Sequence, residues 1–282
     1  MPRFLHRVTL GVALGATLAT TLPAPLRAQS DTIAAPKTAL FTWRDMVLMG
    51  AFVTATGLAA PLDRHIAKSL QDSAVQANHF LGEVADVVRT TAAPGSYVIG
   101  IGLYTYGRLA RNERAADLGL HGTEALVVGQ VIGTVLKGAF GRQRPYKDID
   151  NPDDFKFGRG YSTSGDYQSF PSGHTISAFA AAAAVTSETS RWWPNTRWII
   201  GPVLYSGAAL AGASRMYNNR HWFSDVMFGA AIGTFAGLKV VRWHHTHPGN
   251  KLDRWLLSGT VSRAPNGSAM VQWSVTPDFT AR

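Results

Sequence analysis

The sequence predicts an all-α protein, a compact bundle of about six core helices. Apolar stretches of helical character recur along the 282 residues, and prolines stand in the gaps between them, where proline ends or starts helices. Small residues recur every four positions at Gly129 and Gly133, and again at Gly229, Gly233 and Gly237. Because this spacing puts small residues on one helix face, it favours close contact between helix backbones.

The expected core helices are the apolar stretches 41–60, 95–109, 115–140, 174–189, 197–213 and 222–242. A more polar, amphipathic stretch at 64–90 is also expected to be helical. Residues 146–170 are rich in Asp, Gly, Ser and aromatic residues without an apolar period, which indicates a long loop, and loops of this length are usually either functional or disordered. The tail, 258–282, alternates weakly between polar and apolar residues and is expected either to form an extended strand or to remain unpacked.

The N-terminus has the pattern of a secretory signal peptide. A basic start with Arg3 and Arg7 precedes an apolar run from Val8 to Leu22, and the small residue Ala28 supplies a cleavage site. We therefore predict a signal peptide at 1–28, a helical domain at 29–257 and a C-terminal tail at 258–282. The expected location is outside the cytoplasm, in the periplasm or the cell envelope.

The composition narrows the choice of partners. The formal net charge is +9, which favours anionic partners such as phosphoesters or anionic lipid headgroups. Nucleic acid is not expected, because the basic residues form neither a long run nor a stripe interleaved with aromatic residues. The absence of cysteine excludes disulfides, thiolate catalysis and cysteine metal sites.

A first cluster of interest is Lys137 with Arg144-Pro145, at the end of the expected helix 115–140. Seven residues make two helical turns, so both cations would lie on about the same side if the helix continued that far. An ammonium and a forked guanidinium suit the oxygens of a phosphoryl group. Two cations near a helix C-terminus also simply favour the helix dipole.

A second cluster is Pro171-Ser172-Gly173-His174, which leads directly into an alanine-rich helix. Ser172 is a good N-cap residue, Gly173 leaves room beside the backbone, and free N–H groups at a helix start bind anions. His174 can carry a proton there. The same residues are equally compatible with a capped helix and a chance histidine.

A third cluster is Ser214-Arg215 followed by His221 and Asp225. The last two residues are four apart, so on a helix the carboxylate stacks on the imidazole and orients it, as in a catalytic triad. Arg215 adds a second guanidinium for phosphate. Taken alone, the histidine–aspartate pair is also a common way to stabilise a helix surface.

Together the clusters resemble the three-part signature of the type 2 phosphatidic acid phosphatase (PAP2) and vanadium haloperoxidase superfamily. The resemblance covers about residues 118–242. The matching positions are Lys137, Arg144, Pro145, Pro171, Ser172, Gly173, His174, Ser214, Arg215, His221 and Asp225. It implies a helical bundle with its active site at one end.

The resemblance also implies a mechanism. His221 is the expected nucleophile, forming a phosphohistidine, with Asp225 orienting it and His174 acting as acid and then base. The phosphate oxygens are expected to bind Lys137, Arg144, Ser172, Gly173 and Arg215. No metal and no cofactor are expected, because these cations already neutralise the phosphoryl charge.

The expected function is therefore metal-independent hydrolysis of phosphomonoesters or lipid (di)phosphates. The first alternative is a vanadium-dependent haloperoxidase, in which vanadate occupies the phosphate position. The second is a non-catalytic anion- or lipid-binding protein on the same fold. The substrate is either a phosphorylated small molecule or a lipid phosphate.

Two further features remain to be placed. His244-His245 and His247 invite interpretation as metal ligands, but they fall beyond the expected last helix and are interpreted as a solvated tail.

The apolar stretches are short of the roughly 20 residues needed to span a membrane, and one is interrupted by His121 and Glu124. After signal cleavage, three crossings would also turn the arginine-rich helix ends outward, against the positive-inside rule. We therefore favour an exported protein that is soluble or membrane-associated.

Overall fold

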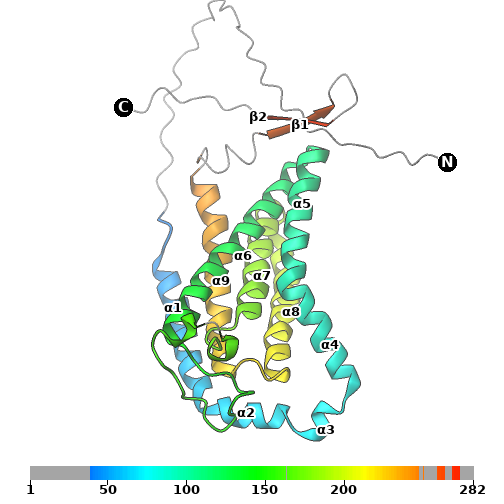
Figure 1. Cartoon of the computed structure of the whole chain (residues 1–282). Coiled ribbons are helices and arrows are strands. Elements are labelled where there is room, and N and C mark those ends of the chain that lie inside the picture. Colours follow the sequence, from blue (N-terminus) through cyan, green and yellow to red (C-terminus); the bar gives the residue numbers. More distant parts are fainter. Residues whose placement is uncertain (1–38, 163, 248–249, 251–258, 264–268, 274–282) are drawn as a thin grey trace, which may run out of the picture. The chain divides into compact units, whose positions relative to one another are not determined.

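The computed structural model confirms the all-α bundle (Figure 1). It describes residues 39–162, 164–247 and 250, and the backbones of two strands further on. The predicted signal peptide, 1–28, lies outside the described residues. The main helices are α1 (Trp43–Ala59), α2 (Asp63–Leu70), α3 (Ser73–Gln76), α4 (His79–Thr90), α5 (Ser96–Ala110), α6 (Glu113–Phe140), α7 (Gly173–Trp192), α8 (Arg197–Tyr217) and α9 (Phe223–Thr246).

Short turns of other helix types connect or interrupt this framework. The 3₁₀ turns are Ala60–Leu62, Arg159–Tyr161, Gly165–Tyr167 and Pro194–Thr196, and a π-helical turn spans Thr91–Gly95. Two antiparallel strands follow the bundle, β1 (Gly259–Arg263) and β2 (Ala269–Trp273), with Val261 opposite Val271. The extended strand expected in the tail is therefore present.

The amphipathic stretch 64–90 is helical, as predicted, but it is divided into the three helices α2, α3 and α4. Two side chains stop and restart the helix, because each caps a new N-terminus. Asp72 accepts a hydrogen bond from the N–H of Ala74 at 2.9 Å, and Asn78 accepts one from Leu81 at 3.3 Å. Competition by such local bonds breaks helical continuity where the apolar period alone predicts none.

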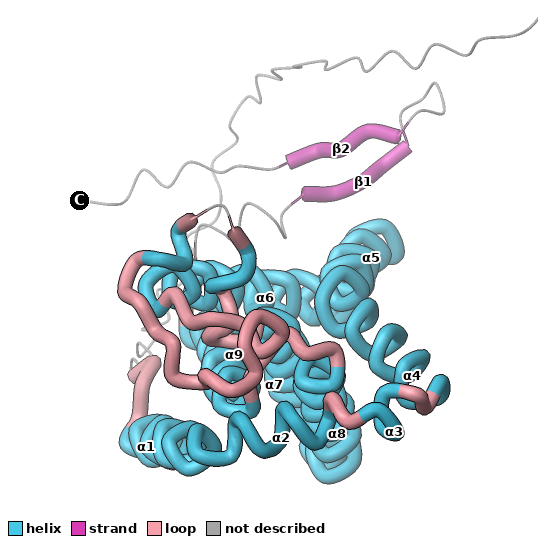
Figure 2. Tube along the Cα trace, turned by 60° about the horizontal axis from the view of Figure 1, so that its bottom comes forward, coloured by secondary structure: helices cyan, strands magenta, loops and turns pink. Residues whose placement is uncertain are grey.

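The small-residue spacing has the structural effect that the sequence predicts. A Cβ atom at Gly233 would lie 2.8 Å from Phe179 Cβ and 2.9 Å from the backbone nitrogen of Ala180. At Gly237 it would lie 2.8 Å from the nitrogen of Ala184. α9 therefore packs directly on the backbone of α7, which is central in the bundle (Figure 2). The buried alanines of α7 complete this contact.

The prediction that the apolar stretches are too short to span a membrane is wrong. Within the described residues, three helical segments are long and apolar enough to span a bilayer: Trp43–Leu70, Glu113–Phe140 and Phe223–Thr246. The physical reason is that His121 and Glu124, which interrupt the apolar run in the sequence, point inward and pair with Glu188 and His244. These partners within the bundle take the place of water as hydrogen-bond partners of the two side chains.

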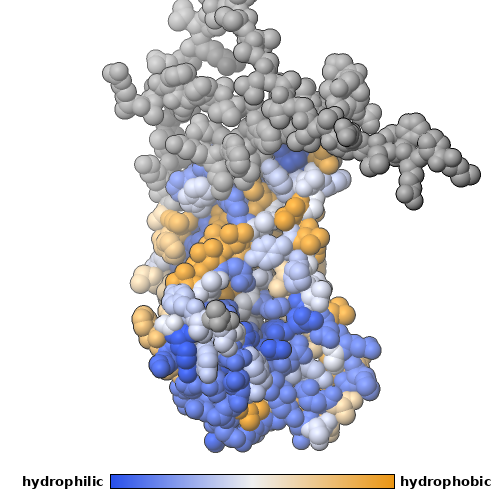
Figure 3. Space-filling view, viewed as in Figure 1, coloured by the Kyte–Doolittle hydropathy of each residue, from blue (hydrophilic) through white to orange (hydrophobic). Residues whose placement is uncertain are grey.

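The outer surface supports association with a membrane. Large apolar side chains are exposed along several helices, a distribution that marks an interaction surface for protein or lipid. Examples are Met46 at 74%, Val98 at 71%, Val131 at 59% and Ile199 at 71% exposure. In Figure 3 the apolar surface lies over the middle and upper part of the bundle, and the end that carries α2 and α3 is hydrophilic.

Candidate active site

The three predicted clusters meet at one end of the bundle. Lys137 lies in the last turn of α6, and Arg215 lies in the last turn of α8. His174 lies in the first turn of α7, and Asp225 in the first turn of α9. Since α6 and α8 end where α7 and α9 begin, four helix termini bring together residues that are far apart in the sequence (Figure 2). The expected position of the site at one end is correct.

The three cations surround both imidazoles. Burial and four nearby cations lower the pKa of His174 to about 4. The cations are Arg215, Arg89, Lys137 and Arg144. Burial also lowers the pKa of His221, and the charges of Lys137 and Arg144 act in the same direction. The free site is therefore cationic at neutral pH through its arginines, with both imidazoles neutral.

The tautomer of His221 is set by the loop between α6 and α7. Its Nδ1–H donates to the carbonyl oxygen of Ser169 at 2.6 Å, and an oxygen of Asp225 lies 3.6 Å from the same nitrogen. The opposite nitrogen, Nε2, faces the guanidinium of Arg144 at 3.5 Å. Nε2 is therefore the unprotonated nitrogen that faces the cations. The sequence predicted this tautomer but assigned the direct bond to Asp225.

Asp225 acts on the surroundings of His221. Its carboxylate accepts hydrogen bonds from the hydroxyl of Ser169 at 2.5 Å and from the N–H of Trp222 at 2.8 Å. These two residues provide the carbonyl that orients His221 and the backbone that precedes α9. The carboxylate thus fixes the frame in which the imidazole is held.

Lys137 and Arg144 are positioned by backbone carbonyls, three of which belong to the segment between α6 and α7 and one, that of Arg220, to the segment between α8 and α9. The ammonium of Lys137 donates to Pro171 at 2.5 Å and to Gln168 at 3.1 Å. The guanidinium of Arg144 donates to Gly165 at 2.7 Å and to Arg220 at 3.0 Å. The loop predicted at 146–170 therefore serves as a support for the cations of the site.

Arg215 is buried without its full set of partners. Its residue is 7% exposed, and in the described part of the chain neither Nε nor one terminal nitrogen, NH1, has a hydrogen-bond partner. Buried guanidinium donors that remain unpaired are costly, so they require an acceptor that binds later. An anion with several oxygens would satisfy them.

The start of α7 remains open to such an anion. Ser172 is the N-cap residue, as predicted, but makes no side-chain bond to the helix backbone. Its hydroxyl instead accepts a hydrogen bond from Thr175 at 2.8 Å. The N–H groups of the first turn, including Gly173, are therefore not occupied by a capping side chain, which suits anion binding.

Sequence analysis missed Arg142 and Asp63. The guanidinium of Arg142 bonds Asp225 at 2.5 Å and Asp63 at 2.7 Å, and it also donates to Ser224 at 2.7 Å. Asp63 in turn accepts from the N–H of Ser224 at 2.8 Å. Arg142 and both carboxylates are buried. The weak signal in the sequence is a third cation, Arg142, between Lys137 and Arg144.

A second group of titratable residues lies at the other end of the bundle. His244 and His245 are not a solvated tail, because α9 continues to Thr246 and carries both. His244 is buried, and His245 pairs with the buried Glu188. His121, Glu188 and His245 place one ligand atom each within 4.8 Å of one another, which is compatible with a metal ion.

Comparison with known proteins agrees with this geometry. The PAP2 superfamily model matches residues 120–248, which contain every residue of the predicted signature. This segment is therefore similar to the PAP2 superfamily. The match begins within α6 and extends just beyond α9, so it covers the four helices that form the site.

Two curated relatives share this PAP2 segment. A lipid A 1-phosphatase of Porphyromonas gingivalis is 35% identical over 115 residues, which make up 40% of this chain and 22% of that protein. An undecaprenyl-diphosphatase of Sulfolobus acidocaldarius is 27% identical over 151 residues, 51% of this chain and 64% of that protein. The chain therefore spans about a fifth of the first relative and just under two thirds of the second.

The fold is also found in a solved PAP2 structure. A transmembrane PAP2 type phosphatidylglycerolphosphate phosphatase from Bacillus subtilis superposes with a TM-score of 0.52 at 18% identity. The superposition covers 74% of this chain and 100% of that one. It confirms that the PAP2 helices are arranged as the sequence predicts.

The first prediction concerns the buried pairs of Arg142. Replacing Arg142→Leu leaves the buried carboxyl groups of Asp63 and Asp225 without their ion-pair partner, so we expect the free energy of unfolding to fall by about 3–5 kcal/mol. The measurement is denaturant unfolding of the detergent-solubilised protein. Lys68→Ala is the matched control, because it breaks an ion pair with Asp150 whose side chains are 51% and 62% exposed. Equal losses in both variants would contradict this account.

The second prediction concerns the protonation of His174. Sulfate remains a dianion across the useful pH range, and its charge should raise the low pKa of His174. Binding of sulfate then takes up a proton, so its inhibition constant should decrease as pH falls, by at most about tenfold per pH unit. The same titration on His174→Asn should show a weaker pH dependence. An unchanged slope in this variant would show that another group takes up the proton.

Proposed function

We propose that this chain is a metal-independent phosphatase that hydrolyses lipid phosphates through a phosphohistidine intermediate. The observation that carries the proposal is the buried, incompletely paired guanidinium of Arg215 beside Lys137, Arg144 and a bare imidazole nitrogen. Such preorganised donors stabilise the charge that spreads over phosphoryl oxygens in the transition state. Binding alone would not require the oriented imidazole.

In the first step, Nε2 of His221 attacks phosphorus. The new P–N bond forms as the P–O bond to the leaving group breaks, and His174 gives its proton to the departing oxygen. In the second step, His174 takes a proton from water, and the water oxygen displaces Nε2 to release phosphate. His221 and His174 then regain their initial protonation, so one ester bond is hydrolysed per cycle.

The bound phosphate makes His174 an acid. In the free site the imidazole has a pKa of about 4 and is neutral at neutral pH. A phosphate dianion offsets the positive charges that depress this pKa, so the proton binds to His174 together with the substrate. Charge neutralisation by Lys137, Arg144 and Arg215 takes the place that a metal ion has in other phosphatases.

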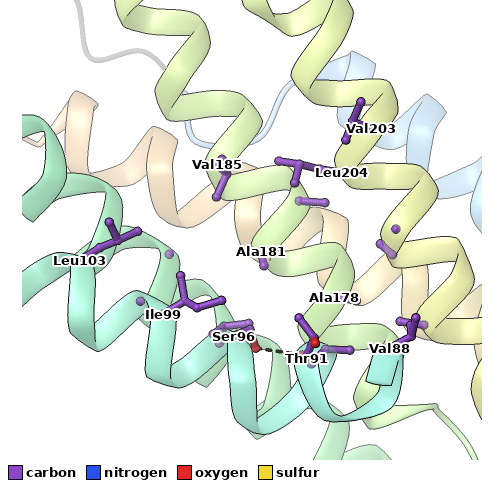
Figure 4. Close-up of a pocket in the computed structure, with 18 of the residues that line it drawn as sticks. Val88, Thr91, Ser96, Ile99, Leu103, Ala178, Ala181, Val185, Val203 and Leu204 are labelled. Atoms are coloured by element: carbon purple, nitrogen blue, oxygen red, sulfur yellow. Dashed lines mark hydrogen bonds between the residues drawn. The ribbon is translucent and has the colours of Figure 1, made fainter. Parts of the chain in front are cut away.

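An apolar pocket beside the site supports a lipid substrate. It has a volume of about 500 Å³ and lies between α4, α5, α7 and α8 (Figure 4). Ile99, Ala181 and Val203 are among its lining residues. Thr91 and Ala92, in the π-helical turn Thr91–Gly95, also line this pocket. A smaller pocket that contains His174 and Gly173 is lined by Ala93 and Pro94 of the same turn. A phosphate at the cations and an apolar chain in the larger pocket would occupy neighbouring spaces.

The relatives agree with this substrate class, since both names refer to phosphates of lipids. Two residues that line the pocket, Ile99 and Val203, are exposed on the apolar helix surface, which supports access to the pocket from a bilayer. The finer choice among lipid monophosphates and diphosphates depends on the groups around the cations, including Arg89 and Arg220.

We further propose that the protein acts outside the cytoplasm, in the cell envelope. The support is the secretory signal-peptide pattern of residues 1–28. Residues 1–38, which contain it, lie outside the described part.

The third prediction tests the covalent intermediate. A phosphoester whose leaving group needs no proton should phosphorylate His174→Asn, but water should release the phosphate slowly because the base is missing. We expect acid-labile, alkali-stable labelling of this variant with ³²P, and none of His221→Asn, whose turnover should fall by more than about 10³-fold. Chelation with EDTA should leave wild-type turnover unchanged. Labelling of His221→Asn, or immediate loss of turnover with EDTA, would contradict the mechanism.

The fourth prediction tests the lipid pocket. Val203 is 64% exposed and lines the pocket, so Val203→Trp should narrow it without breaking the core. We expect kcat/KM to fall about tenfold for a long-chain lipid phosphate, the equivalent of losing contact with about two methylene groups. A water-soluble phosphoester should be hydrolysed as before. Val131→Trp, an exposed valine outside the pocket, is the control. An equal decrease for both substrates would argue against a lipid-specific pocket.

A further inference from the structure

The end of the bundle opposite the phosphate site contains five titratable side chains from three helices. α6 contributes His121 and Glu124, α7 contributes Glu188, and α9 contributes His244 and His245. At 1.5 Å per residue, the cluster lies about 20–30 Å along these helices from Lys137, His174 and Asp225. The phosphatase mechanism uses none of its members.

Glu188 is the centre of this cluster. One of its oxygens contacts Nδ1 of His121, and both oxygens lie 3.0 Å from Nε2 of His245. His121 and Glu188 are buried, and the side chain of His245 is 22% exposed. The three ligand atoms lie within 4.8 Å of one another. One partly exposed ligand leaves a path by which an ion can enter.

The second carboxylate and the third imidazole pack against this group. Nε2 of His244 contacts Glu124, and the ring of His244 stacks on that of His121 with centroids 4.0 Å apart and planes 21° apart. The ring of His245 meets His121 edge-on at 5.5 Å. All three imidazoles therefore touch within one small region between helices.

The charge balance of this arrangement favours a cation. With neutral imidazoles, Glu124 and Glu188 bring two negative charges into a buried region, which is costly without compensation. A divalent ion bound at Glu188 would offset this negative charge.

We propose that His121, Glu188 and His245 bind a divalent metal ion of the zinc class. Two imidazole nitrogens and one carboxylate oxygen are a ligand set typical of zinc, and imidazole ligands suit first-row transition metals in general. Tetrahedral coordination at 2.0–2.1 Å requires ligand atoms about 3.3 Å apart, which the observed grouping approaches. The ion would link α6, α7 and α9 at the end remote from the phosphate.

The metal is a structural one in this proposal. It is independent of the phosphate chemistry, because the metal site lies about 20–30 Å along the helices from Lys137, His174 and Asp225. The phosphatase should therefore turn over without it, and the bound ion should appear as resistance to unfolding. This separates the site from a catalytic metal, which would be required for turnover.

The test uses the untagged full-length protein in detergent, stripped with a chelator and titrated with Co²⁺. We expect one equivalent to bind and to produce the visible absorption bands of tetrahedral cobalt, which Zn²⁺ then abolishes. Saturating Zn²⁺ should also raise the melting temperature. In Glu188→Gln the affinity for Zn²⁺ should fall at least about 100-fold, and the melting temperature should no longer respond.

Two controls keep this test decisive. Glu83→Gln and His65→Ala alter exposed residues of the same types and should bind Co²⁺ like the wild type. His245→Gln removes a partly exposed ligand and serves as the second variant if Glu188→Gln does not fold. Absence of Co²⁺ binding to the wild type would overturn the proposal, as would wild-type binding by either ligand variant. The cluster would then be a metal-free network of ion pairs.

Discussion

The buried guanidinium of Arg142 holds the reaction end together, because it neutralises two carboxylates that come from opposite ends of the folded domain's sequence. Asp63 arrives from α2 and Asp225 from α9, and both are removed from water. Each bond also fixes something beyond itself: Asp63 binds the backbone of Ser224 at the start of α9, and Asp225 binds Ser169 and Trp222 around His221. The cation therefore acts as the common anchor of a helix start, a loop and the frame around the His221 imidazole.

Much of this arrangement could be predicted from the sequence. The apolar period, the prolines and the glycine spacing indicate the bundle, and the three clusters identify the residues that meet at its end. The remainder depends on tertiary contacts that leave no local pattern. Asp63 looks like an ordinary helical aspartate until α2 folds under α9, and the bond from His221 to the Ser169 carbonyl involves a backbone atom that no side-chain motif encodes. The division of 64–90 into three helices depends on two capping residues that a periodicity analysis does not weigh.

The misjudged length of the apolar helices has the same origin. Counting uninterrupted apolar residues treats His121 and Glu124 as exposed to their surroundings, but His121 is buried against Glu188 on α7, and Glu124 pairs with His244 on α9. Polar residues within an otherwise apolar helix are thus evidence about the interior of the bundle. The same partners explain why the histidines late in α9 are not a tail. One cluster corrects two predictions, since both assumed that polar side chains face outward.

The incomplete pairing of Arg215 has a consequence for regulation. Donors that are positioned for a phosphoryl group also bind inorganic phosphate, because the ester substrate and the released phosphate present the same three oxygens. Inorganic phosphate leaving the pocket is thus a competitor for the next substrate molecule. An enzyme built in this way would be slowed by its own product, because phosphate and substrate compete for the same donors.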